Sequence, residues 1–437
     1  YIAAHYDIFE VPSDQIRLTD IASGAIGKVM SASLSAPVNM SNPYGNFYFY
    51  ADGQTESFSG GLVTSGMAQT SDDNGKGGNI YISKGSVSVS DKAVIGRGIA
   101  DYGGGNVYAT STLNVSGGQL LGGRTSTSTK DGGSVYLGSG GTLNLSGGEL
   151  SGGYASDCGG NIYMSNTNSK LAISGGTITG GYAYKYGGNV CLNNGSLNMT
   201  GGTVSKGRGG RGGNLCLMFY ASSTATIGGS GNPQIIDGTA IAGEGGNILF
   251  MDQAHQPNSE YAPHATTPWL AIGKCTIEGG KAASFGKNIY INKYAHFRML
   301  ESFSGETSVY FHDYQMPTDK LYGGMLADGI TAGGDFTGKL ILDNMDSKPF
   351  VLHKNGGLQV AAAATVKDGI YNWFVDNEAM MAAYDATSDY MLVAPGELVL
   401  DSGTYTVDLA GQTVNITGTG AVYGMDSAND TYKTYGS

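Results

Sequence analysis

A short hydrophobic block recurs along most of the chain, and nearly every copy begins with Gly-Gly-Asn or a close variant. The block continues as aliphatic, Tyr, aliphatic, and its copies start at Gly45, Gly77, Gly104, Gly132, Gly159, Gly187, Gly212, Gly245 and Gly286. Between Asn79 and Asn189 the Asn or Ser positions follow one another at steps of 27, 28, 27 and 28 residues. A period of this length indicates a repeat architecture in which every unit folds in the same way.

Two further blocks occupy the interval between these copies. The second block is a strand of alternating apolar and polar residues that ends in Ser/Thr-Gly-Gly, as in 113–118, 143–148, 171–176 and 197–202. The third block is a short strand that comes directly after the second, as in 149–153, 177–181 and 203–207. No helix-period segment separates the blocks, so neither hairpins nor βαβ units place equivalent blocks side by side. We therefore predict an all-β fold, a single-stranded parallel β-helix with three strands and about 27 residues per coil, right-handed as parallel crossovers generally are.

The columns of equivalent residues support this prediction, because an inward position must be apolar in every coil. The first column reads Phe47, Ile80, Val107, Val135, Ile162, Val190, Leu215, Ile248 and Ile289. Two residues further on, the second reads Phe49, Ile82, Ala109, Leu137, Met164, Leu192, Leu217, Phe250 and Ile291. Both columns are expected to face the core, and Leu113, Leu143, Leu171 and Leu197 to line a second wall. The residue between the two columns is expected to point outward.

The repeat divides the chain into four parts. Residues 1–44 lack it and are predicted to form an N-terminal cap, which hides the open end of the core. Residues 45–300 form the regular β-helix, and 301–369 its irregular final coils. Residues 370–437 are predicted to form a C-terminal cap with strands leading towards a further β element. It contains one short helix at 376–384, with Asp376 as the N-cap.

The outward column is rich in aromatic residues and forms a candidate binding strip of Tyr48, Tyr81, Tyr108, Tyr136, Tyr163 and Tyr290. Such a strip offers flat surfaces to sugar rings or to a partner protein. Alternatively, the stacked rings stabilise neighbouring strands beneath the corner loops, and we favour this second interpretation. Cys191 and Cys216 interrupt the column on adjacent coils, where either a disulfide or two free thiols are compatible with the spacing.

Acidic residues precede the Gly-Gly corners of successive coils and form a candidate acidic edge of Asp72, Asp73, Asp101, Asp131 and Asp157. Stacking would bring these carboxylates close enough to bind Ca²⁺ through oxygen ligands. We favour the interpretation that they remain solvated and keep a Gly-rich surface soluble. Neither a catalytic motif nor a metal-ligand motif is recognised elsewhere, and we expect no cofactor.

Composition excludes several classes of protein. Only 14% of the residues are charged and the net charge is −12, with no run of Lys or Arg to neutralise phosphates, so we expect no nucleic-acid partner. No uninterrupted apolar stretch approaches the length of a membrane helix, so we expect no membrane span in this segment. Cys158, Cys191, Cys216 and Cys275 are too few and too widely spaced for a disulfide framework.

The Gly-Gly-x-Ile/Val-Tyr block resembles the repeats of bacterial surface and adhesin β-helices of the polymorphic outer-membrane type, with Asn where those repeats carry Ala. The segment 407–418 is similar to parts of large surface proteins of Gram-positive gut anaerobes. Together these resemblances cover most of residues 45–300 and the tail. They imply a β-helix exported by a bacterium and carry no catalytic residue with them.

We expect an extracellular protein, secreted or attached to a bacterial surface, with a structural or adhesive role. Its partners would be further copies of itself, joined end to end into a filament, or glycans and surface proteins of host or bacterium. One alternative is a polysaccharide lyase or glycoside hydrolase that uses the acidic edge with Arg97 or Arg124. A second is a component of a phage or pilus-like fibre. We lean against an enzyme.

Overall fold

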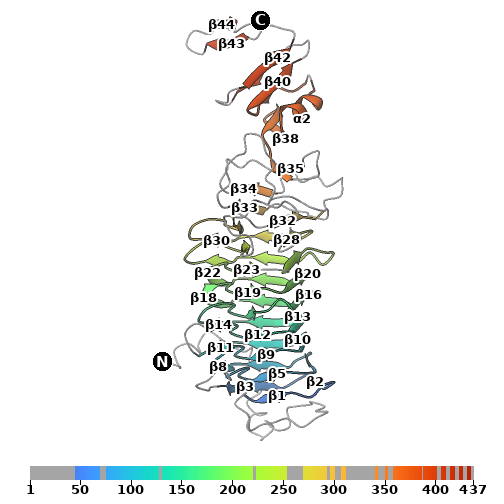
Figure 1. Cartoon of the computed structure of the whole chain (residues 1–437), viewed down its shortest axis with the longest axis vertical. Helices are drawn as coiled ribbons and strands as arrows, with labels where there is room; N and C mark the ends of the chain where they lie inside the picture. Colours follow the sequence, from blue (N-terminus) through green and yellow to red (C-terminus); the bar gives the residue numbers. More distant parts are fainter. Residues whose placement is uncertain are drawn as a thin grey trace.

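The computed structural model describes residues 45–68, 75–126, 130–219, 223–252, 269–292, 296–300, 307–311, 340–342, 350–352, 358–385, 387–400, 405–409, 414–418, 423–426 and 431–434. The regular secondary structure of these residues is almost entirely β-strand, and one short helix is found among them. Parallel strands stack along the long axis of the molecule and form a β-solenoid (Figure 1). The predicted N-terminal cap at 1–44 lies outside the described residues.

The recurring Gly-Gly-Asn blocks build one continuous parallel sheet, sheet A. Its eleven strands, in spatial order, are β1 (Phe47–Phe49), β5 (Ile80–Ile82), β9 (Val107–Ala109), β12 (Val135–Leu137), β15 (Ile162–Met164), β19 (Val190–Asn193), β23 (Leu215–Phe219), β27 (Ile248–Asp252), β31 (Ile289–Ile291), β33 (Thr307–Phe311) and β34 (Leu340–Leu342). Equivalent residues pair directly: Val135 lies beside Val107 on one neighbouring strand and Ile162 on the other. The predicted columns are therefore real neighbours in space.

The second and third blocks both lie in sheet B, which has fifteen strands. They are β2 (Thr55–Phe58), β3 (Leu62–Thr64), β6 (Ser86–Val89), β7 (Val94–Gly96), β10 (Thr112–Leu121), β13 (Thr142–Ser151), β16 (Lys170–Ile173), β17 (Thr177–Thr179), β20 (Ser196–Met199), β21 (Thr203–Ser205), β24 (Thr224–Ile227), β25 (Gln234–Ile236), β28 (Trp269–Ile272), β29 (Thr276–Glu278) and β32 (His296–Met299). In β10 and β13 the two blocks run together as one long strand with register shifts near the Gly-Gly pair.

A third parallel sheet, sheet C, was not identified from the sequence. Its eight short strands are β4 (Met67–Ala68), β8 (Ile99–Ala100), β11 (Arg124–Thr125), β14 (Tyr154–Ala155), β18 (Tyr182–Tyr186), β22 (Arg208–Arg211), β26 (Thr239–Ala240) and β30 (Lys281–Ala282). They come from the residues between the third block and the next Gly-Gly pair. The number of strands per coil and the right-handed winding stay predictions.

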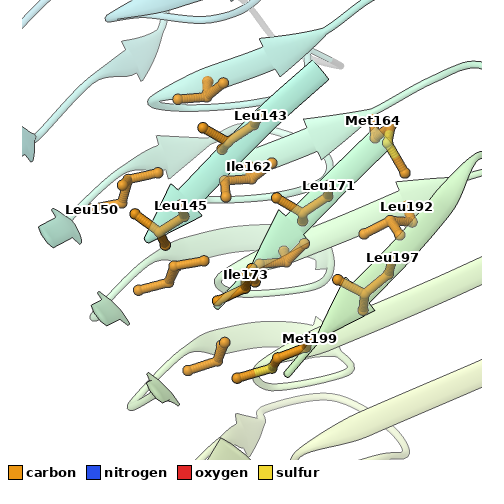
Figure 2. Packing of buried hydrophobic residues seen from close by; sticks show 14 of the residues in the cluster. Leu143, Leu145, Leu150, Ile162, Met164, Leu171, Ile173, Leu192, Leu197 and Met199 are labelled. Carbon is orange, nitrogen blue, oxygen red and sulfur yellow. The ribbon is translucent and has the colours of Figure 1, made fainter. Parts of the chain in front are cut away.

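The interior of the solenoid is a single hydrophobic core, and the predicted inward residues are confirmed in it. All residues of the two columns in sheet A are buried, and so are Leu113, Leu143, Leu171 and Leu197 in sheet B. Figure 2 shows side chains such as Leu145, Ile162 and Ile173 pointing from opposite strands into this core. Because every neighbouring rung presents a similar aliphatic side chain, burial is continuous along the axis, and each buried methylene contributes roughly 0.8 kcal/mol.

The Gly-Gly pairs that precede the strands of sheet A are required by backbone geometry. Gly159, the first of one pair, has a φ of +69°, a conformation that side chains other than glycine rarely adopt. At the second, Gly160, a Cβ would collide with the carbonyl oxygen of Gly188 in the next rung and with the backbone of Tyr182 in sheet C. The abundance of glycine thus follows from the corner of the coil, without a ligand.

Beyond residue 300, β33 and β34 still continue sheet A in parallel. The elements that follow are β35 (Phe350–Leu352), β36 (Leu358–Val360), β37 (Ala363–Lys367), β38 (Ile370–Phe374), α2 (Asn377–Ala382), β39 (Tyr390–Leu392), β40 (Gly396–Leu400), β41 (Val407–Asp408), β42 (Val414–Gly418), β43 (Tyr423–Asp426) and β44 (Thr431–Thr434). Here β35 pairs with β36, β37 with β38 and β39, and β43 with β44, all antiparallel. The helix predicted here is α2, and the side chain of Asp376 accepts a 2.7 Å bond from the Ala379 N–H.

Candidate functional site

A ladder of asparagine side chains runs beside sheet A and fixes the corner of each coil. Asn189 illustrates it. Its Oδ1 accepts bonds from the Gly181 N–H and from Nδ2 of Asn161, both at 2.8 Å. Its Nδ2 donates to the Ser205 carbonyl at 2.7 Å and to Oδ1 of Asn214 at 2.8 Å. All four hydrogen-bonding positions of this fully buried amide are used within the protein, so the asparagine column is structural and offers nothing to a ligand.

The ladder has one weak rung. At the position where the other coils carry Asn, one carries Ser134, and Nδ2 of Asn106 reaches its Oγ at 3.4 Å. A serine hydroxyl is shorter than an amide and has no second donor, so it cannot repeat the four bonds of Asn189. The asparagines therefore form two runs, one ending at Asn106 and one beginning at Asn161.

The tyrosine strip points away from the interior, as predicted, but it is not an open surface. Tyr108, Tyr136, Tyr163 and Tyr290 are each no more than 7% exposed, and Tyr48 and Tyr81 are half-buried. Burial raises the pKa of Tyr108, Tyr136 and Tyr163 well above the ordinary value. Most of the strip is therefore closed to a ligand, which fits the interpretation of rings packed beneath corner segments better than that of a binding strip.

The segments between sheet C and the next Gly-Gly pair fold back over the outer face of sheet A and cover these rings. Isolated parallel bridges join Lys76 to Gly103, Gly103 to Asp131, and Cys158 to Tyr186 along these segments. Together the two layers form what we call the outer cluster: Tyr108, Tyr136, Cys158, Tyr163, Cys191, Cys216, Leu249, Met251 and Tyr290, with Tyr81, Tyr102, Tyr186, Met218 and Tyr310 packed against it. Successive rings lie close, for example 4.8 Å between the centroids of Tyr108 and Tyr136. From β9 to β31, sheet A is consequently buried on both faces.

Three of the four cysteines lie in the outer cluster, and all four are free thiols in this structure. Cys191 and Cys216 are direct partners in the parallel register, and the disulfide considered from the sequence is not formed. Cys191 hydrogen bonds with both Cys158 and Cys216, and its burial raises its pKa. The hydrogen bond with Cys191 lowers the pKa of Cys158, but burial and two nearby carboxylates outweigh it and bring that pKa to about 11. The thiols of Cys158 and Cys191 are therefore protonated and poorly nucleophilic near neutral pH.

The structure brings two members of the candidate acidic edge together. Asp72 and Asp73 lie outside the described residues, and the hydroxyl of Ser126 donates to the carboxylate of Asp101. Ligand atoms of Asp131, Asp157 and Cys158 all lie within 4.8 Å of one another. The Cys158 N–H donates to Oδ1 of Asp131 at 3.0 Å. Burial, and then the negative charge of Asp157, raise the pKa of Asp131 to about 6.

These three residues are the ones that can hold a metal ion in the described part of the chain. A thiol with two carboxylates suits zinc better than Ca²⁺, which takes oxygen ligands alone. Asp157 is already engaged, however, because Nζ of Lys185 donates to its Oδ2 at 3.0 Å. Lys185 balances the negative charge of Asp157 beside the more deeply buried Asp131. The sequence missed Cys158 here because Cys158 and Asp131 occupy equivalent corner positions in adjacent coils but share no chemistry.

A shallow hollow of about 450 Å³ lies near α2 in the C-terminal region and is lined by Asp376, Asn377, Glu378, Met381, Pro395, Glu397 and Val399. Asn377 is fully engaged there. Its Nδ2 donates to the carbonyls of Ala394 and Glu397, and its Oδ1 accepts from the Ala394 N–H. The polar group at the base of this hollow therefore fastens the helix to the strands, and does not face an open site.

Stacked parallel sheets, an asparagine ladder and a core without interruption define the chain as a parallel β-solenoid repeat protein. Comparisons with protein-family models, curated proteins and solved structures found no match. In the part of the chain that the structure describes, no helix is both long enough and apolar enough to cross a bilayer.

Proposed function

We propose that this chain is a rigid rod of an extracellular bacterial surface protein, with a structural or adhesive role, wound as a right-handed coil with three faces. The observation that carries the proposal is the unbroken pairing of eleven parallel strands in sheet A, which is buried on both faces from β9 to β31. At about 4.8 Å per strand, this sheet alone spans roughly 50 Å. The resemblance of the repeat to bacterial surface β-helices supports the location.

Three features support stiffness. The aliphatic columns pack each rung against its neighbours through side chains of nearly equal size. The asparagine ladder links rungs through fully satisfied buried hydrogen bonds, such as the 2.8 Å bond from Asn189 to Asn214. The outer cluster adds a second apolar layer with stacked rings. Bending the rod would open all three at once, as expected for a solenoid in which each repeat depends on the next.

Experiments must distinguish an isolated rod from two other possibilities, a filament joined end to end and a glycan-active enzyme. Electron microscopy of the purified full chain should show straight rods, either single or joined in line. A compact or freely bent particle would overturn the rod. Protein that neither self-associates nor binds bacterial cells or glycans would remove the structural and adhesive roles.

The enzyme alternative has its own assay. The purified chain is incubated with acidic polysaccharides, and unsaturated products and reducing ends are followed over time. We expect neither to accumulate. Turnover that is abolished by Asp131→Asn or Asp157→Asn, but unaffected by Asp52→Asn on the exposed surface, would replace the structural proposal with an enzyme.

A further inference from the structure

The outer face of sheet C is the one extended strand surface of the described solenoid whose aromatic residues stay open. Its outward side chains form a column in register across eight strands: Met67, Ile99, Arg124, Tyr154, Tyr182, Arg208, Thr239 and Lys281. None of these eight residues is acidic, although the whole chain carries a net charge of −12. This column therefore differs in charge from the rest of the protein.

Two stacked tyrosines, with a third beside them in β18, form an aromatic platform at the centre of the column. The rings of Tyr154 and Tyr182 are stacked with 5.4 Å between centroids and only 8° between their planes. Tyr154 is 39% exposed, and Tyr184, two residues beyond Tyr182 in β18, is 65% exposed. The buried rings of the outer cluster, by contrast, are closed off by the segments folded over them. The platform is thus the aromatic surface that a large ligand can reach.

Arginines flank this platform on both sides. Arg124 lies beside Tyr154 in the next strand, and Arg208 lies beside Tyr182 in the strand on the other side. Arg208 is exposed, and Nε of Arg124 is buried without a hydrogen-bond partner. In the described residues neither guanidinium forms an ion pair. Arg208 can therefore bind an anion freely, and Arg124 can do so through its two Nη groups, since its Nε is buried. A guanidinium binds a carboxylate or sulfate through two parallel hydrogen bonds.

We propose that this surface, which we call the sheet C patch (Arg124, Tyr154, Tyr182, Tyr184 and Arg208), binds a linear acidic polysaccharide that lies along the solenoid axis. The inference deepens the adhesive part of the proposed function and rests on it. The exposed ring of Tyr184 offers an apolar surface to sugar rings, and the outward edges of the stacked Tyr154 and Tyr182 add apolar contact beside polar hydroxyl groups. The arginines hold acidic groups on either side, three strand spacings apart, over about 14 Å at the spacing of parallel strands. This length accommodates a short run of sugar residues.

The two arginines of the patch, and not the charge of the whole protein, favour a polyanion over a neutral glycan. Outside the patch a chain of net charge −12 repels a polyanion, so binding must come from local contacts with the two arginines. Long-range attraction cannot supply it, because the Debye length is only about 8 Å at physiological salt. Contacts at the arginines weaken as salt rises, whereas stacking on tyrosine does not. Binding should therefore be reduced, but not abolished, at high ionic strength.

The test uses the purified full chain with four probes: polygalacturonate and hyaluronan as carboxylated polymers, heparin as a sulfated polymer, and dextran as a neutral one. We expect binding to at least one acidic polymer and none to dextran. The double variants Tyr154→Ala/Tyr182→Ala and Arg124→Gln/Arg208→Gln should each weaken that binding at least tenfold. The matched controls Tyr50→Ala, at a tyrosine that is 42% exposed, and Lys84→Gln, at an exposed ion pair, should change it less than twofold.

Each outcome decides for or against the patch. The acidic polymer that binds identifies the group that the patch recognises, either carboxylate or sulfate. Loss of binding in the arginine variant alone would overturn the platform and indicate simple ion exchange. Absence of binding, or equal binding of dextran, would overturn the proposal altogether. If the protein is a straight rod that binds cells but no acidic polymer, the sheet C patch is ruled out and the proposed function is retained. If the protein does not form rods, the proposed function itself is ruled out, whatever the patch binds.

Discussion

The two faces of sheet A carry different kinds of core. The inner face contributes Val, Ile and Leu to the solenoid interior, where every neighbour along the axis is nearly the same residue. The outer face contributes Tyr, Cys and Leu to a cluster that is closed by a less regular segment. In β12, for example, Val135 and Leu137 face inward, and Tyr136 faces outward, yet all three are buried. One strand therefore satisfies two separate packing requirements.

This difference shows what a column of like residues and a column of mixed residues each indicate about packing. A column of like residues identifies a position that meets its own copy in the next coil, and this is sufficient to predict the inner core. A mixed column such as Tyr163, Cys191, Cys216 and Leu249 meets a different cover in each coil. The cover changes from Tyr102 to Cys158 to Tyr186 along the axis, so the outer residues vary with it.

We expect the largest loss of stability when the buried side-chain amide of Asn189, which fixes the coil beside both faces of sheet A, is removed. Asn189→Ala leaves the Gly181 N–H, the Ser205 carbonyl and two neighbouring amides without partners in a buried position. At about 1 kcal/mol or more for each unsatisfied group, we expect a loss of at least about 4 kcal/mol. Hydrogen exchange of the backbone amides in β15, β19 and β23 measures this locally, which suits a repeat protein better than one global unfolding curve.

Two substitutions control this experiment. Asn189→Ser reproduces the natural Ser134 rung and should cost less than Asn189→Ala, because one hydroxyl still bonds to the ladder. Ser134→Asn joins the two runs of asparagine and should slow exchange in β12 and β15. If all three variants behaved alike, the ladder would contribute nothing beyond side-chain volume.

Smaller losses of stability, measured at two adjacent residues of β15, compare the two faces of sheet A directly. Ile162→Ala opens a cavity in the inner core and should cost about 3 kcal/mol. Tyr163→Ala, the next residue, should cost about as much, because its ring is buried in the outer cluster. Tyr154→Ala, at a partly exposed ring of sheet C, should cost less than about 1 kcal/mol. Chemical denaturation of the three variants side by side provides the comparison. If Tyr163→Ala lowered the free energy of unfolding as little as Tyr154→Ala does, the outer cluster would not act as a hydrophobic core.

The smallest effect depends on pH and concerns the edge of the outer cluster. The pKa of Asp131 is raised from 3.8 to about 6, so the folded protein holds this proton more tightly than the unfolded chain does. Its contribution to stability is complete below about pH 4 and is lost as the pH rises through 6. Asp131→Asn keeps an acceptor for the Cys158 N–H and removes the charge.

Thermal unfolding of this variant at two pH values checks the sign. We expect Asp131→Asn to be more stable than the parent at pH 7.5 by on the order of 1 kcal/mol, and equal to it below pH 4. Asp52→Asn, at a side chain that is 84% exposed, should change little at either pH. An Asp131→Asn variant that is less stable at pH 7.5 would contradict the burial of that charge.

The sequence was sufficient for the inner core, because its columns repeat at nearly constant spacing from Phe47 to Ile291. It was insufficient for sheet C, whose strands are mostly two residues long and carry pairs as unlike as Arg124-Thr125 and Tyr154-Ala155. Their inward residues are mostly small, such as Ala100 and Ala155, and do not indicate a core strand.

The sequence carries a further signal for the burial of the tyrosines. Blocks such as Val190-Cys191-Leu192 and Ile248-Leu249-Phe250 are apolar at three successive positions. Continuous apolar runs are typical of parallel strands covered on both faces, whereas a strand with one open face alternates with polar residues. The acidic edge could be predicted only in part, because whether Asp131 and Asp157 converge depends on how the corner segments fold back.

The asparagine ladder also gives the rod a direction. Every amide in it donates toward the next rung along the chain, from Asn161 through Asn189, Asn214 and Asn247 to Asn288. Each rung receives from its predecessor the same bond that it passes on. Excision or duplication of one whole period would rejoin equivalent partners, so the length of such a protein can change in steps of one rung while its cross-section stays the same.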